Sequence, residues 1–357
     1  MEDDERAKIM INTKNVDSLD CVKGIACIFV ILIHCTFPGV VGEMLRAIAR
    51  FAVPLFFTVT GYFLLDSHGK VTRARILRKM GHIVKITILA DAFYMIFRYG
   101  CFCILGGGTV QEVFVENLSV EKFVRFVLTN SPFFYSHLWF LYALIYSYGT
   151  LYIIGSKLIS KKWKPVYAIL ALLTFTLFSE VLPTFGVQRS FTSFHIGIHN
   201  FFGLRALPFI VIGLILRENT YKIQTLNDYT QKRNIIAIVV FAVISIIERF
   251  AFVDSQFYIG SYAMVVLILI YCIRNPDCFS NVLRYIGKKL SLYVYVIQYA
   301  IIEILDFLSG KIVPQQFTLI FARLKPVLCI FLALTLSVII TKVHEKLTVI
   351  CRERIRK

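Results

Sequence analysis

Two ionisable residues, Lys23 and His34, lie in the first apolar run of the chain, residues 19–38. Their spacing is about three full turns of an α-helix, so a helix here points both side chains the same way, about 16 Å apart along its axis. Ionisable residues inside a membrane span indicate function by default. A neutral histidine can accept a proton near pH 7, and a lysine can steer a donor or stabilise negative charge. Lys23 and His34 are therefore the catalytic candidates.

Each of these two residues also has a purely structural interpretation. The long Lys23 side chain can carry its charge to the membrane surface, and it can pair with Asp20, one helical turn earlier. His34 can serve as a contact within a helix bundle. Residue types and spacing leave these alternatives open.

A second candidate group is a pair of arginines between the second and third apolar runs. Arg75 and Arg78 are three positions apart and would share one face of a helix that enters the membrane. Two guanidinium groups suit the phosphates of a phosphorylated donor. The alternative is an ordinary basic loop on the cytoplasmic side. We expect Arg75 and Arg78 to bind the donor.

Further charged residues lie toward the opposite ends of other apolar runs. Arg205 and Glu180 are the two that we expect to bind substrate, in a polar cavity that opens outward and meets His34. Taken singly, each residue of this group is more typical of a structural ion pair. The other members are Arg50, Arg98, Glu248, Arg249 and Glu303. The nine cysteines include no C-x-x-C pair and no metal-ligand spacing, so we predict no metal site.

The elements that position these residues are membrane helices. Hydrophobic residues make up 57% of the 357-residue chain and charged residues only 17%, whereas average usage is about 45–50% apolar and about 25% charged. This composition excludes a disordered chain, a coiled coil and a disulfide-stapled secreted module. The predicted fold class is all-α, a polytopic membrane bundle of about ten transmembrane helices in one domain, 1–357, because a span needs about 20 apolar residues. The predicted spans are residues 19–38, 48–66, 80–105, 138–155, 165–183, 201–216, 234–253, 257–273, 286–308 and 326–343.

The basic residues predict the orientation of these spans. The net charge is +17, from 39 Lys and Arg against 22 Asp and Glu. Most of the basic residues fall in alternate connecting segments and near the two termini, as they do on the cytoplasmic side of membrane proteins. We therefore expect both termini to be cytoplasmic, in a multi-pass protein of the cell membrane. Residues 1–18 would form an N-terminal segment and residues 344–357 a basic tail, and no nucleic-acid partner is implied.

Five segments, in chain order, resemble motifs of the acyltransferase 3 family of membrane proteins. The first, residues 19–26 (LDCVKGIA) with His34, is similar to the family's L-D-x-L-R-G-I-A opening, which usually has Arg where Lys23 stands. Lysine keeps the charge and loses the planar fork. The second, residues 54–64 (PLFFTVTGYFL), resembles F-F-x-x-S-G-F-L, with Thr60 in place of Ser. The others are residues 75–78 (RILR), 137–141 (HLWFL) and 200–209 (NFFGLRALPF).

This resemblance implies a membrane O-acyltransferase, an O-acetyltransferase in the usual case. Such an enzyme moves an acyl group from cytoplasmic acetyl-CoA to a hydroxyl of an extracytoplasmic envelope glycan or related acceptor, with no permanently bound cofactor. Its partners would be acetyl-CoA, the glycan acceptor and the lipid bilayer. Arg75 and Arg78 would then hold the CoA phosphates. Lys23 would steer the donor or stabilise charge, and His34 would act as general base or carry the acyl group briefly.

Two other functions remain open from the sequence. Some proteins with this membrane domain also carry a soluble racemase domain and have been assigned substrate uptake, so a transporter or permease is the main alternative. A non-catalytic partner in polysaccharide export is another. Buried charge occurs in enzymes and transporters alike, and the acceptor and the acyl length are also left open.

Overall fold

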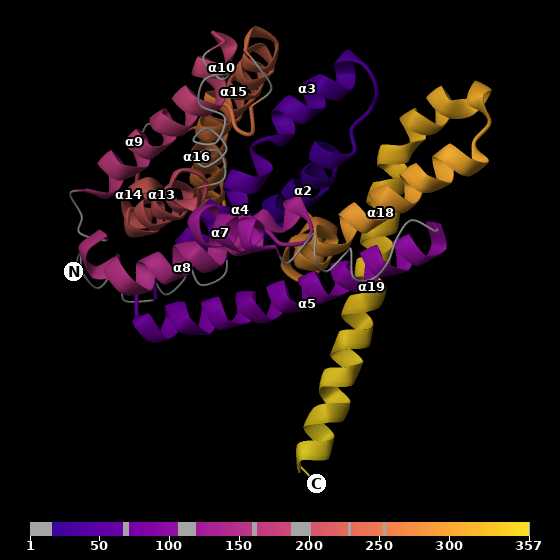
Figure 1. Ribbon diagram of the computed structural model, residues 1–357. Helices are drawn as coiled ribbons and strands as arrows, with labels where there is room; N and C mark the ends of the chain where they lie inside the picture. Colours follow the sequence, from indigo (N-terminus) through magenta and orange to yellow (C-terminus); the bar gives the residue numbers. More distant parts are fainter. Residues whose placement is uncertain are drawn as a thin grey trace. The chain divides into compact units, whose positions relative to one another are not determined.

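The computed structural model describes residues 16–66, 71–105, 119–158, 163–186, 201–227, 230–252 and 255–356. In these ranges every regular element is a helix (Figure 1), so the predicted all-α fold is confirmed. The described residues form two compact units. Unit 1 is Val53–Arg274, and unit 2 combines Val16–Ala52 with Asn275–Lys357. Each unit is described by itself below.

Unit 2 brings the two ends of the chain together around α2. In this unit α2 packs against α17, the π-turn η4 and α18, and α18 packs against α19. The elements of unit 2 are α2 (Asp17–His34), α3 (Val40–Ala49), α17 (Asn281–Tyr285), η4 (Ile286–Leu290), α18 (Ser291–Ile312), η5 (Gln315–Phe317) and α19 (Thr318–Arg356).

Unit 1 has its core between α4, α8, α9 and α13. Large buried side chains such as Phe57, Phe175 and Phe209 fill this core. Two helix pairs lie beside it, α5 with α8 and α15 with α16. The elements of unit 1 are α4 (Ala52–Tyr62), α5 (Arg73–Leu105), α7 (Val120–Thr129), η1 (Ser136–Leu138), α8 (Trp139–Leu158), α9 (Lys164–Thr176), η2 (Leu177–Val181), α10 (Leu182–Thr184), α12 (Phe202–Arg205), α13 (Leu207–Glu218), α14 (Thr220–Gln224), α15 (Gln231–Ala251) and α16 (Ile259–Arg274).

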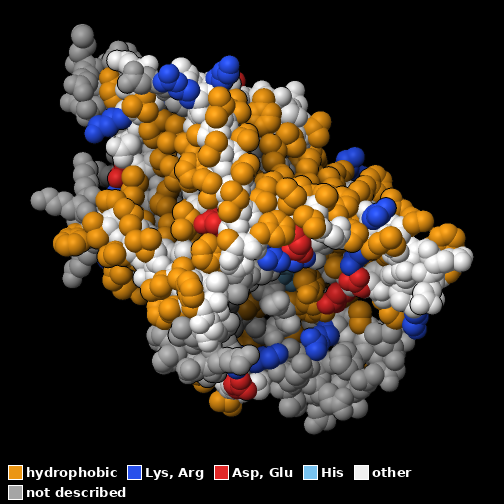
Figure 2. All heavy atoms as spheres, turned by 90° about the horizontal axis from the view of Figure 1, so that it is seen from above, with side chains coloured by type: hydrophobic (Ala, Val, Ile, Leu, Met, Phe, Trp, Pro, Cys, Tyr) orange, Lys and Arg blue, Asp and Glu red, His pale blue; other side chains and the backbone are white. Residues whose placement is uncertain are grey.

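Six described helical segments are long and apolar enough to cross a membrane. They are Arg73–Cys101, Ser136–Gly155, Lys164–Thr184, Gln231–Ala251, Asn281–Ile312 and Gln315–Ile350. Their outer faces expose large apolar side chains, for example Leu89 at 69%, Ile247 at 59% and Phe331 at 64%. Figure 2 shows the same property, because hydrophobic side chains cover most of the visible described surface. Lipid can cover such faces, so the chain is a membrane protein, and the number of ten spans stays a prediction.

The helices differ from the predicted spans at several boundaries. The predicted run 48–66 is divided, because α3 ends at Ala49 and α4 begins at Ala52. The third predicted span, 80–105, lies within α5. This helix begins at Arg73 and not near residue 80, so Arg75 and Arg78 lie in its first turns. The last helix begins at Thr318 and continues through Arg356. Hydropathy detects only the apolar part of a helix. Backbone hydrogen bonds continue the helix into polar turns at either end, and hydropathy misses these turns.

The short helix α7 is amphipathic and carries an apolar face that unit 1 does not cover. Ser119 caps its N-terminus by accepting a hydrogen bond from the Lys122 backbone N–H. Phe126 attaches the helix to α8, because its carbonyl accepts a hydrogen bond of 2.7 Å from the Tyr146 hydroxyl. Val120, at the first position of the helix, is 80% exposed. This pattern is typical of a helix that lies in the membrane interface.

Two glycines bring α4 and α13 into close contact in unit 1. A Cβ on Gly61 would lie 2.0 Å from the Ile210 carbonyl oxygen, and a Cβ on Gly213 would lie 2.0 Å from the Thr58 carbonyl oxygen. Real Cβ atoms do not come so close, so only glycine allows this crossing. Small residues at such contacts are typical of helix pairs in membranes. The family-like motif 54–64 therefore has a packing role at Gly61.

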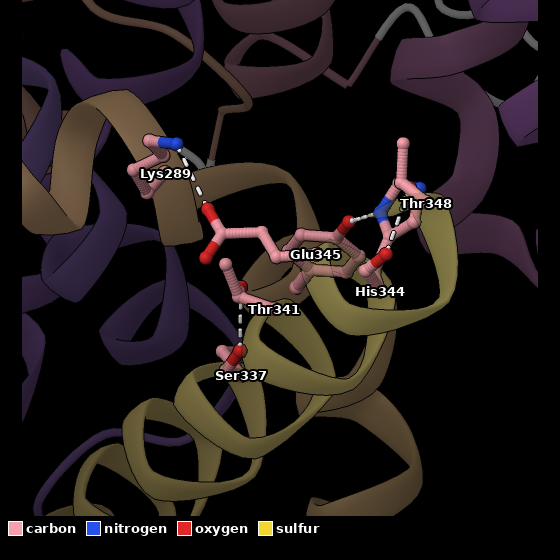
Figure 3. Close-up of polar contacts among 7 residues, drawn as sticks. Lys289, Ser337, Thr341, His344, Glu345 and Thr348 are labelled. Carbon is pink, nitrogen blue, oxygen red and sulfur yellow. Dashed lines mark hydrogen bonds and ion pairs between the residues drawn. The ribbon is translucent and has the colours of Figure 1, made fainter. Parts of the chain in front are cut away.

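Two polar contacts connect α19 to η4 and to α18 in unit 2 (Figure 3). The Lys289 ammonium of η4 pairs with the Glu345 carboxylate at 2.9 Å, and the Tyr293 hydroxyl lies 2.5 Å from His344 Nδ1. Thr341 and Thr348 donate to carbonyls of their own helix, one turn earlier. The predicted basic tail is therefore, as far as Arg356, a continuation of α19, and its first residues contact η4 and α18.

Candidate functional site

The first part of the candidate site is His34, at the last position of α2 in unit 2. Its side chain is exposed. The imidazole packs edge-on against the Tyr299 ring of α18, with 5.8 Å between ring centroids and 80° between planes. This contact sets the orientation of the ring. An exposed, oriented imidazole is available to take a proton from a bound hydroxyl.

Two arginines from α3 and its C-terminal end lie within electrostatic range of His34. They are Arg46 and Arg50. The chain turns from α2 into α3 at Gly39, whose φ of 78° is in the left-handed region that glycine adopts readily. Arg50 is 8% exposed, and Arg46 pairs with Glu43 at 3.5 Å. Buried or partly buried guanidinium groups beside a base can stabilise negative charge that develops during a reaction.

Lys23 lies on the same helix, about three turns before His34. Its ammonium contacts the Asp20 carboxylate at 2.6 Å, and the two side chains are 20% and 17% exposed. The ion pair with Asp20, which the structural interpretation of Lys23 allowed, is thus present. The pair keeps some exposure, so a negatively charged ligand can reach Lys23 if it competes with Asp20 for the ammonium group.

Close helix packing holds this part of α2 in place. A Cβ on Gly24 would lie 2.2 Å from the Leu283 carbonyl oxygen of α17. On the other side of the contact, a Cβ on Gly287 would lie 1.9 Å from the Asp20 carbonyl oxygen. Gly287 lies in the π-turn η4, and π-turns are frequent at functional sites. The glycines therefore position Asp20 and its partner Lys23.

The predicted donor-binding arginines lie in the first turns of α5 in unit 1. Arg75 is partly exposed and donates from Nη2 to the Phe63 carbonyl at 3.0 Å, just after α4. Arg78 is exposed. The structure confirms that both residues are on a helix, three positions apart. One guanidinium is anchored on the backbone, and the other extends into solvent.

Arg205, predicted to bind substrate, is buried in unit 1 and is held on two sides. Its guanidinium lies over the Trp139 ring, 3.4 Å from the centroid, which is a close cation–π contact. Nη2 donates to Gln256 Oε1 at 2.7 Å. Trp139 belongs to the motif 137–141 and Arg205 to the motif 200–209, so the fold brings these two motifs together.

Glu180, the other predicted substrate residue, lies in the π-turn η2 of unit 1 and is 1% exposed. Neither carboxylate oxygen has a hydrogen-bond partner among the described residues. Glu248, within electrostatic range of it, accepts from the backbone N–H groups of Ile259 and Gly260 at 3.2 and 3.0 Å. A buried carboxylate without a partner is costly, so Glu180 is available to a polar ligand.

One short segment contacts the surroundings of both Arg205 and Glu180. Gln256 accepts the hydrogen bond from Arg205, and the neighbouring Ser255 lies 3.3 Å, hydroxyl to hydroxyl, from Ser179. Ser179 directly precedes Glu180. The segment 255–256 therefore contacts both Arg205 and the residue next to Glu180, and substrate binding by these two residues stays a prediction.

Sequence reasoning assigned no role to three neighbours of these residues. Tyr299 and Gln256 are ordinary residues in an apolar run and a connection, and no pattern distinguishes them. Trp139 was noticed only as part of a motif. Their roles depend on contacts between segments far apart in the chain, which no local pattern shows. No group of three or more His, Cys, Asp or Glu side chains suited to a metal ion occurs in the described part of the chain.

A test of the Arg205 site is the change Arg205→Lys, which keeps the charge and removes the planar fork that stacks on Trp139. For the acyl transfer from acyl-CoA that the motif resemblance implies, we expect the rate at saturating donor to fall about tenfold, the equivalent of one hydrogen bond to a charged group of about 1.5 kcal/mol. The measurement is acyl label transferred by membranes at matched protein level.

The matched control is Arg217→Lys. Arg217 is also buried in unit 1 and also lies over an aromatic ring, that of Tyr62, at 5.1 Å. If both variants lose the same activity, the effect reflects general packing of unit 1, and Arg205 has no special role toward the substrate.

Comparison with known proteins adds the family. The acyltransferase 3 family, described as an acyltransferase domain, matches residues 16–342. Comparisons with curated proteins and with solved structures each find no match. The family match covers nearly the whole chain and includes all six predicted site residues, His34, Lys23, Arg75, Arg78, Arg205 and Glu180. The chain therefore belongs to the acyltransferase 3 family and is a membrane acyltransferase.

Proposed function

We propose that this protein is an O-acyltransferase that moves an acyl group, acetyl in the first instance, from cytoplasmic acyl-CoA to a hydroxyl of an extracytoplasmic envelope glycan or a related acceptor. The observation that carries the proposal is His34, an exposed imidazole oriented by Tyr299 in a chain of an acyltransferase family. The cell membrane and cytoplasmic termini, predicted from the basic residues, belong to the same proposal.

In the proposed reaction the acceptor oxygen attacks the thioester carbonyl while His34 takes the hydroxyl proton. The carbon–sulfur bond of the thioester then breaks, and the proton passes to the departing thiolate of CoA. The thioester is already an activated acyl donor, so a single base is sufficient. A brief acyl-histidine intermediate is the alternative course of the same reaction.

Positive charge supports this reaction in two ways. Arg46 and Arg50 lie within electrostatic range of the His34 ring, where they can stabilise the oxyanion of the tetrahedral intermediate. Lys23, on the same helix, can steer the donor or stabilise its charge. In unit 1, Arg75 and Arg78 suit the phosphates of CoA, because guanidinium groups bind phosphate with two hydrogen bonds. Arg205 and Glu180 suit the polar groups of the acceptor.

The direct test uses membranes that contain the protein and acetyl-CoA labelled in the acetyl group. We expect label to enter an envelope fraction, and chemical identification of the labelled product then names the acceptor. Uptake of a solute without any transfer of label would instead support a transporter and would contradict the proposal.

The donor site gives a separate prediction. The change Arg78→Ala removes an exposed guanidinium, and we expect the KM for acyl-CoA to rise about tenfold or more with little change in kcat, because a charge-assisted hydrogen bond contributes about 1.5–3 kcal/mol. The measurement is the initial rate of label transfer at increasing acyl-CoA concentration.

Arg73→Ala is the control for this prediction. Arg73 lies in the same first turns of α5 and is exposed, but its guanidinium lies over the Tyr152 ring, 5.5 Å from the centroid. We expect its KM to stay unchanged. An equal rise in KM for both variants would mean that only the general positive charge of this region matters.

A further inference from the structure

Two cysteines that are 257 positions apart meet at the beginning of α2. Cys21 Sγ lies 2.9 Å from Cys278 Sγ in unit 2. This is closer than an ordinary contact between two sulfur atoms, and a disulfide bond needs about 2.0 Å. The two sulfurs therefore need to approach by only about 1 Å to form a bond.

The surrounding contacts hold the two thiols in this position. The backbone N–H of Ser18 donates to the Pro276 carbonyl at 3.1 Å, and Arg284 pairs with Asp17 at 2.7 Å. These contacts lie on either side of Cys278 in the sequence and fix the connection between α16 and α17 against the first turn of α2. Contacts among four other residues therefore keep the segments that carry the two thiols side by side.

The two thiols differ in their access to solvent. Cys21 is fully buried, and its sulfur also lies 3.3 Å from the Ser280 carbonyl oxygen. Cys278 is partly exposed. A reagent in solution can therefore reach Cys278 first, and Cys21 is then in position to complete the exchange. This division between an attacked and a resolving thiol is typical of redox-active pairs.

We infer that Cys21 and Cys278 form a reversible redox pair that closes to a disulfide on contact with an organic disulfide. In the first step the Cys278 thiolate attacks one sulfur of the organic disulfide, forms a mixed disulfide and releases one thiolate. In the second step the Cys21 thiolate attacks the Cys278 sulfur and releases the other thiolate. The two protons lost by the cysteines end on the two released thiols, so the exchange balances.

The bond would fix the first turns of α2, which carry Asp20 and Lys23, to the connection before α17. The predicted orientation places this end of α2 on the cytoplasmic side, where thiols are kept reduced. The pair would then be open in the resting cell and would close under oxidising conditions.

The experiment uses the purified full-length chain in detergent, with oxidised glutathione as the probe. After incubation, remaining thiols are alkylated, and the digested protein is analysed by mass spectrometry without reduction. We expect a linked peptide pair that contains Cys21 and Cys278, the loss of two alkylated thiols per chain, and recovery of both after dithiothreitol. Absence of the linked pair in the parent protein would overturn the inference.

Variants distinguish this pair from a second one. Cys35 and Cys329 also share a hydrogen bond in unit 2, but both are buried. The variant Cys278→Ser changes a residue in a partly exposed connection and removes one of the two thiols. We expect its remaining partner, Cys21, to stay reduced after incubation with oxidised glutathione. Cys35→Ser should oxidise like the parent. If Cys278→Ser still loses two thiols, the reactive pair lies elsewhere and the inference is wrong.

Discussion

In membranes that contain the His34→Ala variant, we expect transfer of acyl label from acyl-CoA to envelope material to fall by about 10²–10⁴-fold, the usual contribution of a general base. The substitution removes the imidazole at the end of α2 and leaves the Arg46 and Arg50 charges in place. The measurement is the initial rate of label transfer, with the amount of membrane-inserted protein determined in the same samples.

The control for this variant is His82→Ala. His82 is also exposed on a long helix, but it belongs to α5 in unit 1. We expect the His82 variant to keep parental activity. Full activity in His34→Ala at equal expression would refute the proposed mechanism, whatever the acceptor is.

The same variants separate the two roles left open for His34. If the imidazole carries the acyl group, the parent protein mixed with acyl-CoA in the absence of acceptor should release one CoA per chain in a burst, and His34→Ala should show none. If the imidazole is only a base, neither protein gives a burst. Both outcomes agree with loss of transfer in the His34 variant, and the burst decides between them.

The second large effect is expected from Gly287→Ala, which adds a single methyl group to η4. Its Cβ would lie 1.9 Å from the Asp20 carbonyl oxygen and 2.6 Å from the Gly24 nitrogen. Backbone atoms cannot yield as a flexible side chain does, so α2 and η4 must separate. We expect a loss of about 1–3 kcal/mol in stability and a fall in activity, because Lys23 and its partner Asp20 move with α2.

Gly310→Ala is the matched control in the same unit. Gly310 lies in α18, is exposed, and an added Cβ there meets nothing within 4 Å. Alanine has a higher helix propensity than glycine, by about 1 kcal/mol, so this variant should be as stable as the parent or more so. The measurement is the midpoint of thermal unfolding in detergent. Equal midpoints for the two variants would show that α2 and η4 do not pack as described.

Several site predictions could be made from the sequence because they depend on local spacing. Lys23 and Asp20 are one helical turn apart, and the structure shows their ion pair. Arg75 and Arg78 are three positions apart, and both lie on α5. In each case the helix itself sets the distance between the residues, so a correct prediction of helix was sufficient.

Contacts between distant segments could not be predicted in this way. Arg205 was expected to face an acceptor. In the structure it lies in α12 and contacts Trp139 of α8 and Gln256 of the connection before α16, two segments far from it in the sequence. Glu180 was one charge among several, and only burial without a partner in the described residues distinguishes it. The hydropathy of a segment reports its environment, and it does not report which other segment lies beside it.

The sequence by itself determined the membrane bundle, the family and the candidate residues, because apolar runs, helical spacing and motifs are local properties of the chain. Only the tertiary structure decided which segments meet. Gly287 could be recognised as a packing residue only once η4 lay against Asp20, and Cys21 and Cys278 became a pair only because the connection before α17 lies on the first turn of α2. These contacts depend on shape and close packing over 250 residues of intervening chain, a property that no short stretch of sequence contains.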